Sequence, residues 1–496
     1  MSREAEPTLG AAARSGARWT AGAFYVETVV RLGISIALAR LLAPADFGTM
    51  ALAMAFVGFV ALMQDSGLSS ALVQHPEPVL PAATTVLVLT TTGGVLLAGA
   101  SWVLAPVVAG FADSPQVTPL LRALGFLFMV RGLSNPPRAL LQRAMRFRVL
   151  AAVEVASTAA YGAAGLGLAV AGTGVWALVL AQIVSELVTA ALVWRATAFR
   201  PRIADFDLRE ARVLGTFGRH MVAASLMGLL HVQLPTLLVG RMLGAEILGL
   251  YWVAFRWAQL PINGFTFVAS RVAYPVYARL RNEPGRFADG YLRVLQTIVT
   301  LALPASVGLA LVADALVGTL YDARWQATVA PLRILACYGF FAAVAATTGE
   351  VFKGAGVPRW VTIYATLYNV VLAASLLALG STHGLQGIAC ATVLAPVVTS
   401  AVALSRVARI LGIALRRMAG LVVAPALATA VMAAAVVLVS HALGDAGPAT
   451  RLAAESATGA LTYALALWLA APAWCREAAA TIGLTRVTVR VDEKPA

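Results

Sequence analysis

Long apolar runs follow one another along almost the whole chain, and short polar segments separate them. Each run has about 20 residues, the length at which an α-helix crosses a hydrocarbon layer ~30 Å thick. A helix also satisfies its own backbone hydrogen bonds, as a segment inside lipid must. The pattern predicts an all-α polytopic membrane protein with about 14 transmembrane helices. The predicted segments are residues 19–43, 47–72, 84–110, 118–137, 149–170, 174–194, 214–239, 246–270, 291–313, 330–351, 358–380, 384–408, 415–440 and 455–474.

Basic residues alternate from loop to loop. With the N-terminus placed in the cytoplasm, 28 of the 37 Lys and Arg residues fall on the cytoplasmic side and six on the other. The remaining three, Arg31, Arg131 and Arg256, lie inside predicted spans. The positive-inside rule accounts for this asymmetry and predicts that both termini are cytoplasmic. The net charge of +14 is thus explained by topology, and no nucleic-acid partner is expected.

The residue content argues against most classes of enzyme. The chain is 60% hydrophobic and 12% charged, and its three cysteines and five histidines are scattered. These spacings match neither a disulfide framework nor a metal site, and no G-x4-G-K-[ST] loop for nucleotide phosphates occurs. No long extracytoplasmic loop is present to hold catalytic groups. We therefore expect no cofactor, no metal, no ATP hydrolysis and no enzymatic step.

The chain contains an internal repeat. When the sequence is shifted by 201 residues, Arg40–Gly48 lies over Arg241–Gly249, and both segments read R-x-L-x5-G. The offset spans an even number of predicted helices, so equivalent helices run in the same direction. We expect two parallel six-helix lobes followed by two extra C-terminal helices. The predicted divisions are a cytoplasmic N-terminus (1–17), an N-lobe (18–195), a cytoplasmic linker (196–213), a C-lobe (214–410), helices 13 and 14 (411–475) and a cytoplasmic tail (476–496).

Several predicted spans carry polar residues along one helical face. Glu27 and Arg31 are one turn apart, so each partly neutralises the other. A charge inside a span costs ~2.5–3.5 kcal/mol on insertion scales, which makes such residues functional candidates by default. They predict an aqueous cavity between the lobes, in which guanidinium groups bind a large anionic substrate such as a pyrophosphate head group. The candidate cavity residues are Arg31, Arg256, Glu27, Gln259, Asn263, Arg131 and His231.

Most of these candidates also have a structural interpretation. The Glu27–Arg31 pair would equally lock its helix to a neighbour, and His231 is well explained as an interior histidine with satisfied hydrogen bonds. Glu186 and Glu350 are either proton or sodium sites or, as we prefer, hydrogen-bond partners across helices. Arg256 is harder to explain in this way, because no acid lies near it in its own span.

A basic segment follows the fourth predicted span. The span ends in Ser134-Asn-Pro-Pro137, which predicts a stop and a turn. Arg138–Arg148 then mixes Arg with Met145 and Phe147, which predicts a position on the cytoplasmic membrane surface. Anionic lipid head groups contribute ~1 kcal/mol per nearby basic residue, so membrane lipids are expected partners of this segment.

At this point several motifs resemble a known family. Ala39–Gly48 resembles the first-helix signature of bacterial polysaccharide (O-antigen-type) flippases, which belong to the multidrug/oligosaccharidyl-lipid/polysaccharide exporter superfamily. The resemblance covers residues 10–420 and is closest to the branch that handles capsule and exopolysaccharide repeat units. Further stretches similar to this family are Pro137–Arg148, Gly174–Val179, Gly249–Tyr251, Leu320–Trp325 and Pro331–Leu335.

The resemblance implies a 14-helix fold in the bacterial cytoplasmic (inner) membrane. It also implies that polyprenyl-pyrophosphate-linked oligosaccharide moves from the inner to the outer leaflet by alternating access, with glycosyltransferases and a polysaccharide polymerase as further partners. One departure matters: many relatives have an Asp in a D-x4-G-x3-G context where this chain has Pro235. An ion-coupling role cannot be carried over to that position, and Pro235 predicts a kink instead.

Three other functions stay open at this stage. A flippase for the peptidoglycan lipid precursor would share both the fold and the anionic head group. A drug or cation antiporter of the same superfamily would more often have acidic cavity residues, which the Arg-bearing faces argue against. A membrane-embedded glycosyltransferase or polymerase would need carboxylates or histidines at a membrane surface, and the sequence has no such cluster.

Overall fold

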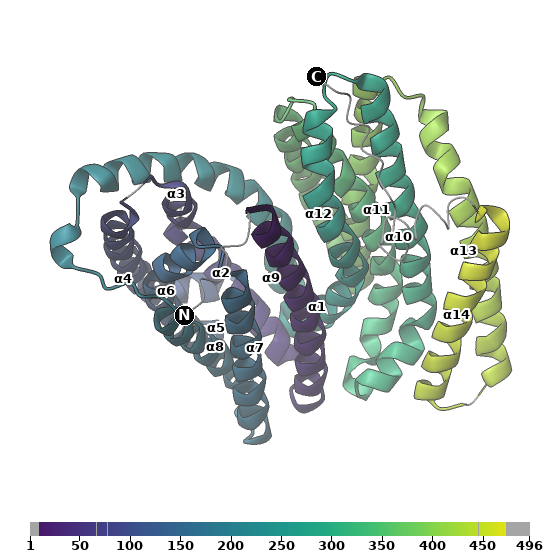
Figure 1. Cartoon of the computed structure of the whole chain (residues 1–496). Helices are drawn as coiled ribbons and strands as arrows, with labels where there is room; N and C mark the ends of the chain where they lie inside the picture. Colours follow the sequence, from purple (N-terminus) through teal and green to yellow (C-terminus); the bar gives the residue numbers. More distant parts are fainter. Residues whose placement is uncertain (1–8, 66, 77, 445, 473–496) are drawn as a thin grey trace, which may run out of the picture. The chain divides into compact units, whose positions relative to one another are not determined.

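A computed structural model describes residues 9–65, 67–76, 78–444 and 446–472 of the chain. Every regular element in these residues is a helix, which confirms the predicted all-α class (Figure 1). In order, the elements are α1 (Leu9–Leu41), α2 (Pro44–Asp65), α3 (Leu68–Gln74), α4 (Val79–Phe111), α5 (Val117–Leu124), α6 (Phe126–Arg143), α7 (Phe147–Val170), α8 (Trp176–Ala196), η1 (Ile203–Asp205), α9 (Leu208–Arg279), α10 (Pro284–Leu320), η2 (Ala323–Thr328), α11 (Val329–Gly354), α12 (Arg359–Leu411), α13 (Leu415–Leu443) and α14 (Pro448–Ala470).

Each predicted span overlaps these helices, but two pairs of spans are merged, and the predicted spans 47–72 and 118–137 each cover two helices. Helix α9 contains both 214–239 and 246–270, and α12 contains both 358–380 and 384–408. Among the described residues, ten helical segments are long and apolar enough to cross a membrane, as judged by length and composition. The polytopic character follows from this, and the number of 14 spans stays a prediction.

Each merged helix is broken at a glycine. Gly244 in α9 has φ 83° and ψ 174°, and Gly384 in α12 has φ 55° and ψ −135°. These are conformations that side chains disfavour and glycine adopts readily. The break in α9 therefore lies at Gly244, beyond the position of Pro235 at which the sequence predicts a kink.

The predicted stop at Ser134-Asn-Pro-Pro137 is wrong. Helix α6 continues through Pro136 and Pro137 and ends only at Arg143. A proline inside a helix removes one backbone donor and leaves the carbonyl four residues earlier without its usual partner. The two orphaned carbonyls belong to Gly132 and Leu133.

Side chains from two other helices satisfy both of these carbonyls. The Thr90 hydroxyl of α4 donates to the Gly132 carbonyl at 2.7 Å, and the Trp194 indole of α8 donates to the Leu133 carbonyl at 3.0 Å. Neighbouring helices often restore a proline-broken ladder inside a membrane in this way. The Pro-Pro pair is thus tolerated because its partners come from elsewhere in the chain.

The two copies of the sequence repeat meet in a reciprocal contact. A Cβ built on Gly48 would lie 1.7 Å from the carbonyl oxygen of Ala245, and one built on Gly249 would lie 1.9 Å from that of Pro44. Gly48 and Gly249 occupy the same place in the repeat, and so do Pro44 and Ala245. The contact therefore has approximate two-fold symmetry. Glycine at both positions lets the backbones of α2 and α9 touch.

Replacing Gly48 with alanine should destabilise the protein, because the new methyl group overlaps a backbone oxygen that no rotamer change can move. Overpacking typically costs 1–3 kcal/mol, so we expect a loss of about 2 kcal/mol or more. The thermal unfolding midpoint of the detergent-purified protein measures it. Gly93→Ala in α4 is the matched control, because no atom lies within 4 Å of its Cβ position. Equal midpoints for the two variants would refute the close backbone contact.

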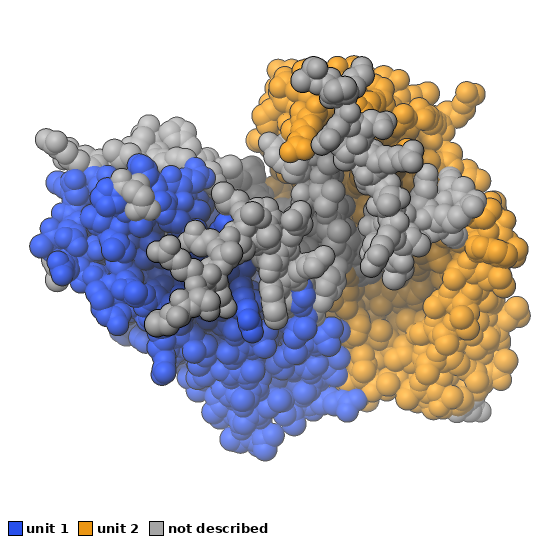
Figure 2. Space-filling view, in the orientation of Figure 1, with its two compact units in different colours: residues 1–252, 376–388 blue, residues 253–375, 389–496 orange. Residues whose placement is uncertain are grey.

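The chain divides into two compact units, coloured separately in Figure 2. Unit 1 comprises residues 1–252 and 376–388, and unit 2 comprises residues 253–375 and 389–496. In unit 1, α1 packs on α7, α7 on α8, and α4 on α6. In unit 2, α10 packs on α11, α13 and α14 around a core that includes Tyr291 and Phe352. The predicted division into lobes stays a prediction.

Candidate functional site

The first candidate pair lies one helical turn apart in α1. The guanidinium of Arg31 and the carboxylate of Glu27 form an ion pair with a 2.8 Å N–O distance. The side chain of Arg31 is 56% exposed, and that of Glu27 is 20% exposed. Helix α1 therefore presents a largely uncovered guanidinium, and its carboxylate partner on the same face is the more covered of the two.

A second ion pair lies next to this one, on the helices that pack together in unit 1. Arg138 of α6 forms an ion pair with Glu154 of α7. Glu27 and Arg31 also act on Glu154 electrostatically, and α1 packs directly on α7. These four residues from three helices, Glu27, Arg31, Arg138 and Glu154, are called the charged seam below. Two acids and two bases balance its charge.

The sequence analysis missed Glu154 as a member of this site. A signal was present, because a carboxylate inside the predicted span 149–170 carries the same insertion cost as Glu27. It also assigned Arg138 to the membrane surface, whereas the structure pairs Arg138 with Glu154. Their pairing depends on the packing of α6 against α7, which no local pattern encodes.

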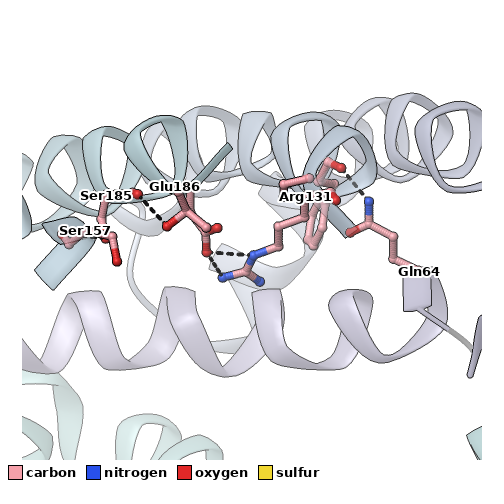
Figure 3. Close-up of polar contacts among 8 residues, drawn as sticks. Gln64, Arg131, Ser157, Ser185 and Glu186 are labelled. Carbon is pink, nitrogen blue, oxygen red and sulfur yellow. Dashed lines mark hydrogen bonds and ion pairs between the residues drawn. The ribbon is translucent and has the colours of Figure 1, made fainter. Parts of the chain in front are cut away.

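Arg131 is held by an acid from a neighbouring helix. Its Nε and one terminal nitrogen donate to Oε1 of Glu186 on α8 at 2.8 and 2.6 Å (Figure 3). Both side chains are mostly covered, at 24% and 17% exposed. Beside them, Ser185 donates to the Ser157 carbonyl, and Gln64 donates to a backbone carbonyl of α6. The preferred interpretation of Glu186, a hydrogen bond across helices, is confirmed, whereas Glu350 pairs with Lys353 of its own helix α11 at 2.7 Å.

The remaining candidates lie on α9. Arg256 is partly buried and acts electrostatically on Tyr321, whose hydroxyl accepts a 2.9 Å hydrogen bond from the Trp257 indole. Gln259, one turn along, forms a hydrogen bond with Tyr338, which is buried in unit 2. The side chains of Asn263 and His231 lie outside the described part of the structure.

The candidates therefore form two groups, one in each unit. Glu27, Arg31 and Arg131 belong to unit 1, whereas Arg256 and Gln259 belong to unit 2. Guanidinium groups suit bidentate binding of phosphate oxygens and keep their charge at every working pH. In the described residues no three His, Cys, Asp or Glu side chains gather where they would hold a metal ion. In unit 1 the guanidinium groups of Arg31 and Arg131 are each paired with a carboxylate.

Comparison with known proteins identifies the family. Residues 37–330, more than half of the chain, match the model of a family described as "Polysaccharide biosynthesis protein". The chain belongs to this family. This agrees with the resemblance drawn from Ala39–Gly48 and the other motifs. It also explains why those motifs extend over most of the N-terminal two-thirds of the sequence.

Three relatives are similar to the chain over 60–71% of its length. The teichuronic acid biosynthesis protein TuaB of Bacillus subtilis is 25% identical over 71% of this chain and 73% of its own. The lipopolysaccharide biosynthesis protein WzxC of Escherichia coli is 24% identical over 68% of each. The succinoglycan biosynthesis transport protein ExoT of Rhizobium meliloti is 26% identical over 60% of each.

Solved structures confirm the fold class. The lipid II flippase MurJ in an inward closed conformation matches with a TM-score of 0.76 at 12% identity, covering 91% of this chain and 98% of its own. An inward-facing multidrug MATE transporter matches with a TM-score of 0.63 at 17% identity, covering 77% and 95%. At these identities the likeness establishes an all-helical transporter fold, and it says nothing about the substrate.

Proposed function

We propose that the chain moves polyprenyl-pyrophosphate-linked oligosaccharide repeat units from the inner to the outer leaflet of the bacterial cytoplasmic membrane, for lipopolysaccharide, capsule or exopolysaccharide synthesis. Its membership of the polysaccharide biosynthesis family and the names of its relatives supply the substrate class. The structural observation that carries the proposal is Arg31. Its guanidinium is 56% exposed even though Glu27 pairs with it, and an exposed charge is costly against lipid, so this exposed part suits a place beside water or a bound anion.

The charged seam suggests how the pyrophosphate is received. Arg31 is paired with Glu27 when no substrate is bound, so its charge stays compensated. An incoming pyrophosphate competes with Glu27 for the guanidinium and offers it a bidentate partner of higher charge. Arg138 stays paired with Glu154 in both conditions, so only the carboxylate of Glu27 is released when the pyrophosphate binds Arg31.

Arg256, Gln259 and Asn263 are proposed as further contacts to the same substrate, together with Arg131 and His231. In this proposal Arg256 binds the pyrophosphate, and the polar side chains bind sugar hydroxyls. The transport cycle alternates access between the two leaflets, makes and breaks no covalent bond, and needs no cofactor. Glycosyltransferases that build the repeat unit supply the substrate, and a polymerase consumes it.

Purified protein in liposomes tests the proposal. The vesicles carry a fluorescent polyprenyl-pyrophosphate-linked oligosaccharide, and a glycosidase added outside digests only the molecules in the outer leaflet. We expect the protein to make nearly all of the substrate digestible, whereas protein-free vesicles leave about half protected. Vesicles that carry the peptidoglycan lipid precursor form the second arm. Movement of that precursor alone would replace the proposed function with cell-wall precursor transport.

A further inference from the structure

One end of unit 1 contains a cavity that is separate from the charged seam. It has a volume of about 510 Å³ and is lined by the first residues of α4, the last residues of α6 with those just after them, and the residues that follow α8. All of these segments lie just beyond predicted spans, on the side that the positive-inside rule assigns to the cytoplasm. The residues that line it include Val79, Leu80, Leu140, Arg143, Ala144, Arg146 and Phe199.

Two guanidinium groups at this cavity are fixed in place by backbone carbonyls. Arg143 donates to the carbonyls of Val73 and His75, and Arg146 donates to the carbonyl of Ala196 at 2.8 Å. A guanidinium carries five N–H donors, and the bond to Ala196 uses one of those on Arg146. The two charges are therefore pre-positioned at the cavity, and no acidic side chain is among its described lining residues.

The rest of the lining is apolar. Val79, Leu80 and Leu140 contribute aliphatic surface, and Leu80 is 55% exposed. Phe199 is buried and stacks on Trp194 with ring centroids 5.7 Å apart, which gives the cavity a rigid aromatic wall. A ligand that fits both parts has a compact anionic head and a hydrocarbon tail.

We propose that this cavity binds the phosphate of an anionic membrane phospholipid such as phosphatidylglycerol. Arg143 and Arg146 bind the phosphate, and the glycerol backbone and first methylenes lie against Leu80 and Leu140. Basic pockets between helices on the cytoplasmic side of a membrane suit such head groups. The volume matches a small-molecule site and is too small for an oligosaccharide repeat unit together with its pyrophosphate.

Native mass spectrometry of the detergent-purified full chain, titrated with phosphatidylglycerol, tests the proposal. The double variant Arg143→Gln/Arg146→Gln should weaken binding about thirty-fold, because each basic residue contributes to head-group affinity. Ala144→Phe should also weaken it several-fold without any change of charge, because Ala144 lines the cavity. Arg148→Gln is the matched control from the same basic segment, and it should bind like the wild type.

Two further ligands show whether the cavity recognises a phospholipid or any compound that carries phosphate. Inorganic phosphate should bind far more weakly than phosphatidylglycerol, because it lacks the hydrocarbon that the apolar wall receives. Polyprenyl pyrophosphate should not displace the lipid. Equal affinity of all variants for phosphatidylglycerol would overturn the proposal. It would also be overturned if polyprenyl pyrophosphate displaced phosphatidylglycerol from the wild type but not from the double variant, because the cavity would then bind the transported substrate. Export is not measured, so the result is independent of the proposed transport function.

Discussion

Arg256→Ala should abolish polysaccharide export while leaving the amount of protein in the membrane unchanged. Arg256 sits on α9 within reach of Tyr321, in a span with no acid nearby along its own helix. If it binds the substrate pyrophosphate, its removal deletes a bidentate contact to the most highly charged part of the substrate. The measurement is complementation of export in a strain that lacks the chain, with the protein quantified in isolated membranes.

Arg256→Lys separates charge from geometry in the same assay. Lysine keeps the positive charge but loses the planar fork, so only part of the export should return. Arg293→Ala is the matched control, because Arg293 is exposed on α10 of the same unit. Wild-type export by Arg256→Ala at normal membrane levels would contradict a role for Arg256 in binding the substrate.

Glu186→Gln should destabilise the protein markedly. The substitution removes the negative charge that compensates Arg131, and the side chains of both residues are mostly covered. Breaking a buried pair from one side costs 3–5 kcal/mol, and the residual exposure of this pair reduces our expectation to about 2 kcal/mol. The thermal unfolding midpoint in detergent measures the effect.

Removing both partners should restore most of that stability. The double variant Arg131→Met/Glu186→Leu leaves no uncompensated charge and fills the space with apolar atoms. Such an exchange often leaves the free energy of unfolding unchanged. Glu246→Gln, an exposed acid on α9, is the control for loss of a carboxylate as such. A single variant as stable as the wild type, or a double variant less stable than Glu186→Gln, would contradict this account of the pair.

The positions of the helices could be predicted because hydrophobicity is a local property. The span predicted at 149–170 corresponds to α7, and the one predicted at 415–440 corresponds to α13. The fold class followed from the same property. The internal repeat was also visible as a spacing, although nothing in the spacing indicated that Gly48 and Gly249 lie against each other's helices.

The errors and omissions came from contacts that are distant in sequence. The Pro136–Pro137 pair ends a helix by local rules, and it does not do so here because Thr90 and Trp194 supply the missing donors. Glu154 was overlooked for a similar reason, since its role depends on helices that pack side by side. The link between Arg256 and Tyr321 joins two motifs that the sequence analysis had treated separately.

The distribution of lipid-linked oligosaccharide between the two leaflets is the measurement that tests the central claim most directly. Spheroplasts of a strain deleted for the chain are labelled from outside with a lectin specific for the repeat unit. The account predicts inner-leaflet accumulation without the chain and outer-leaflet label with it. Arg31→Ala should resemble the deletion, and Glu27→Gln should be milder, because Glu27 modulates Arg31 and does not bind the substrate. Outer-leaflet label in the deletion strain, or with Arg31→Ala at the wild-type level, would contradict it.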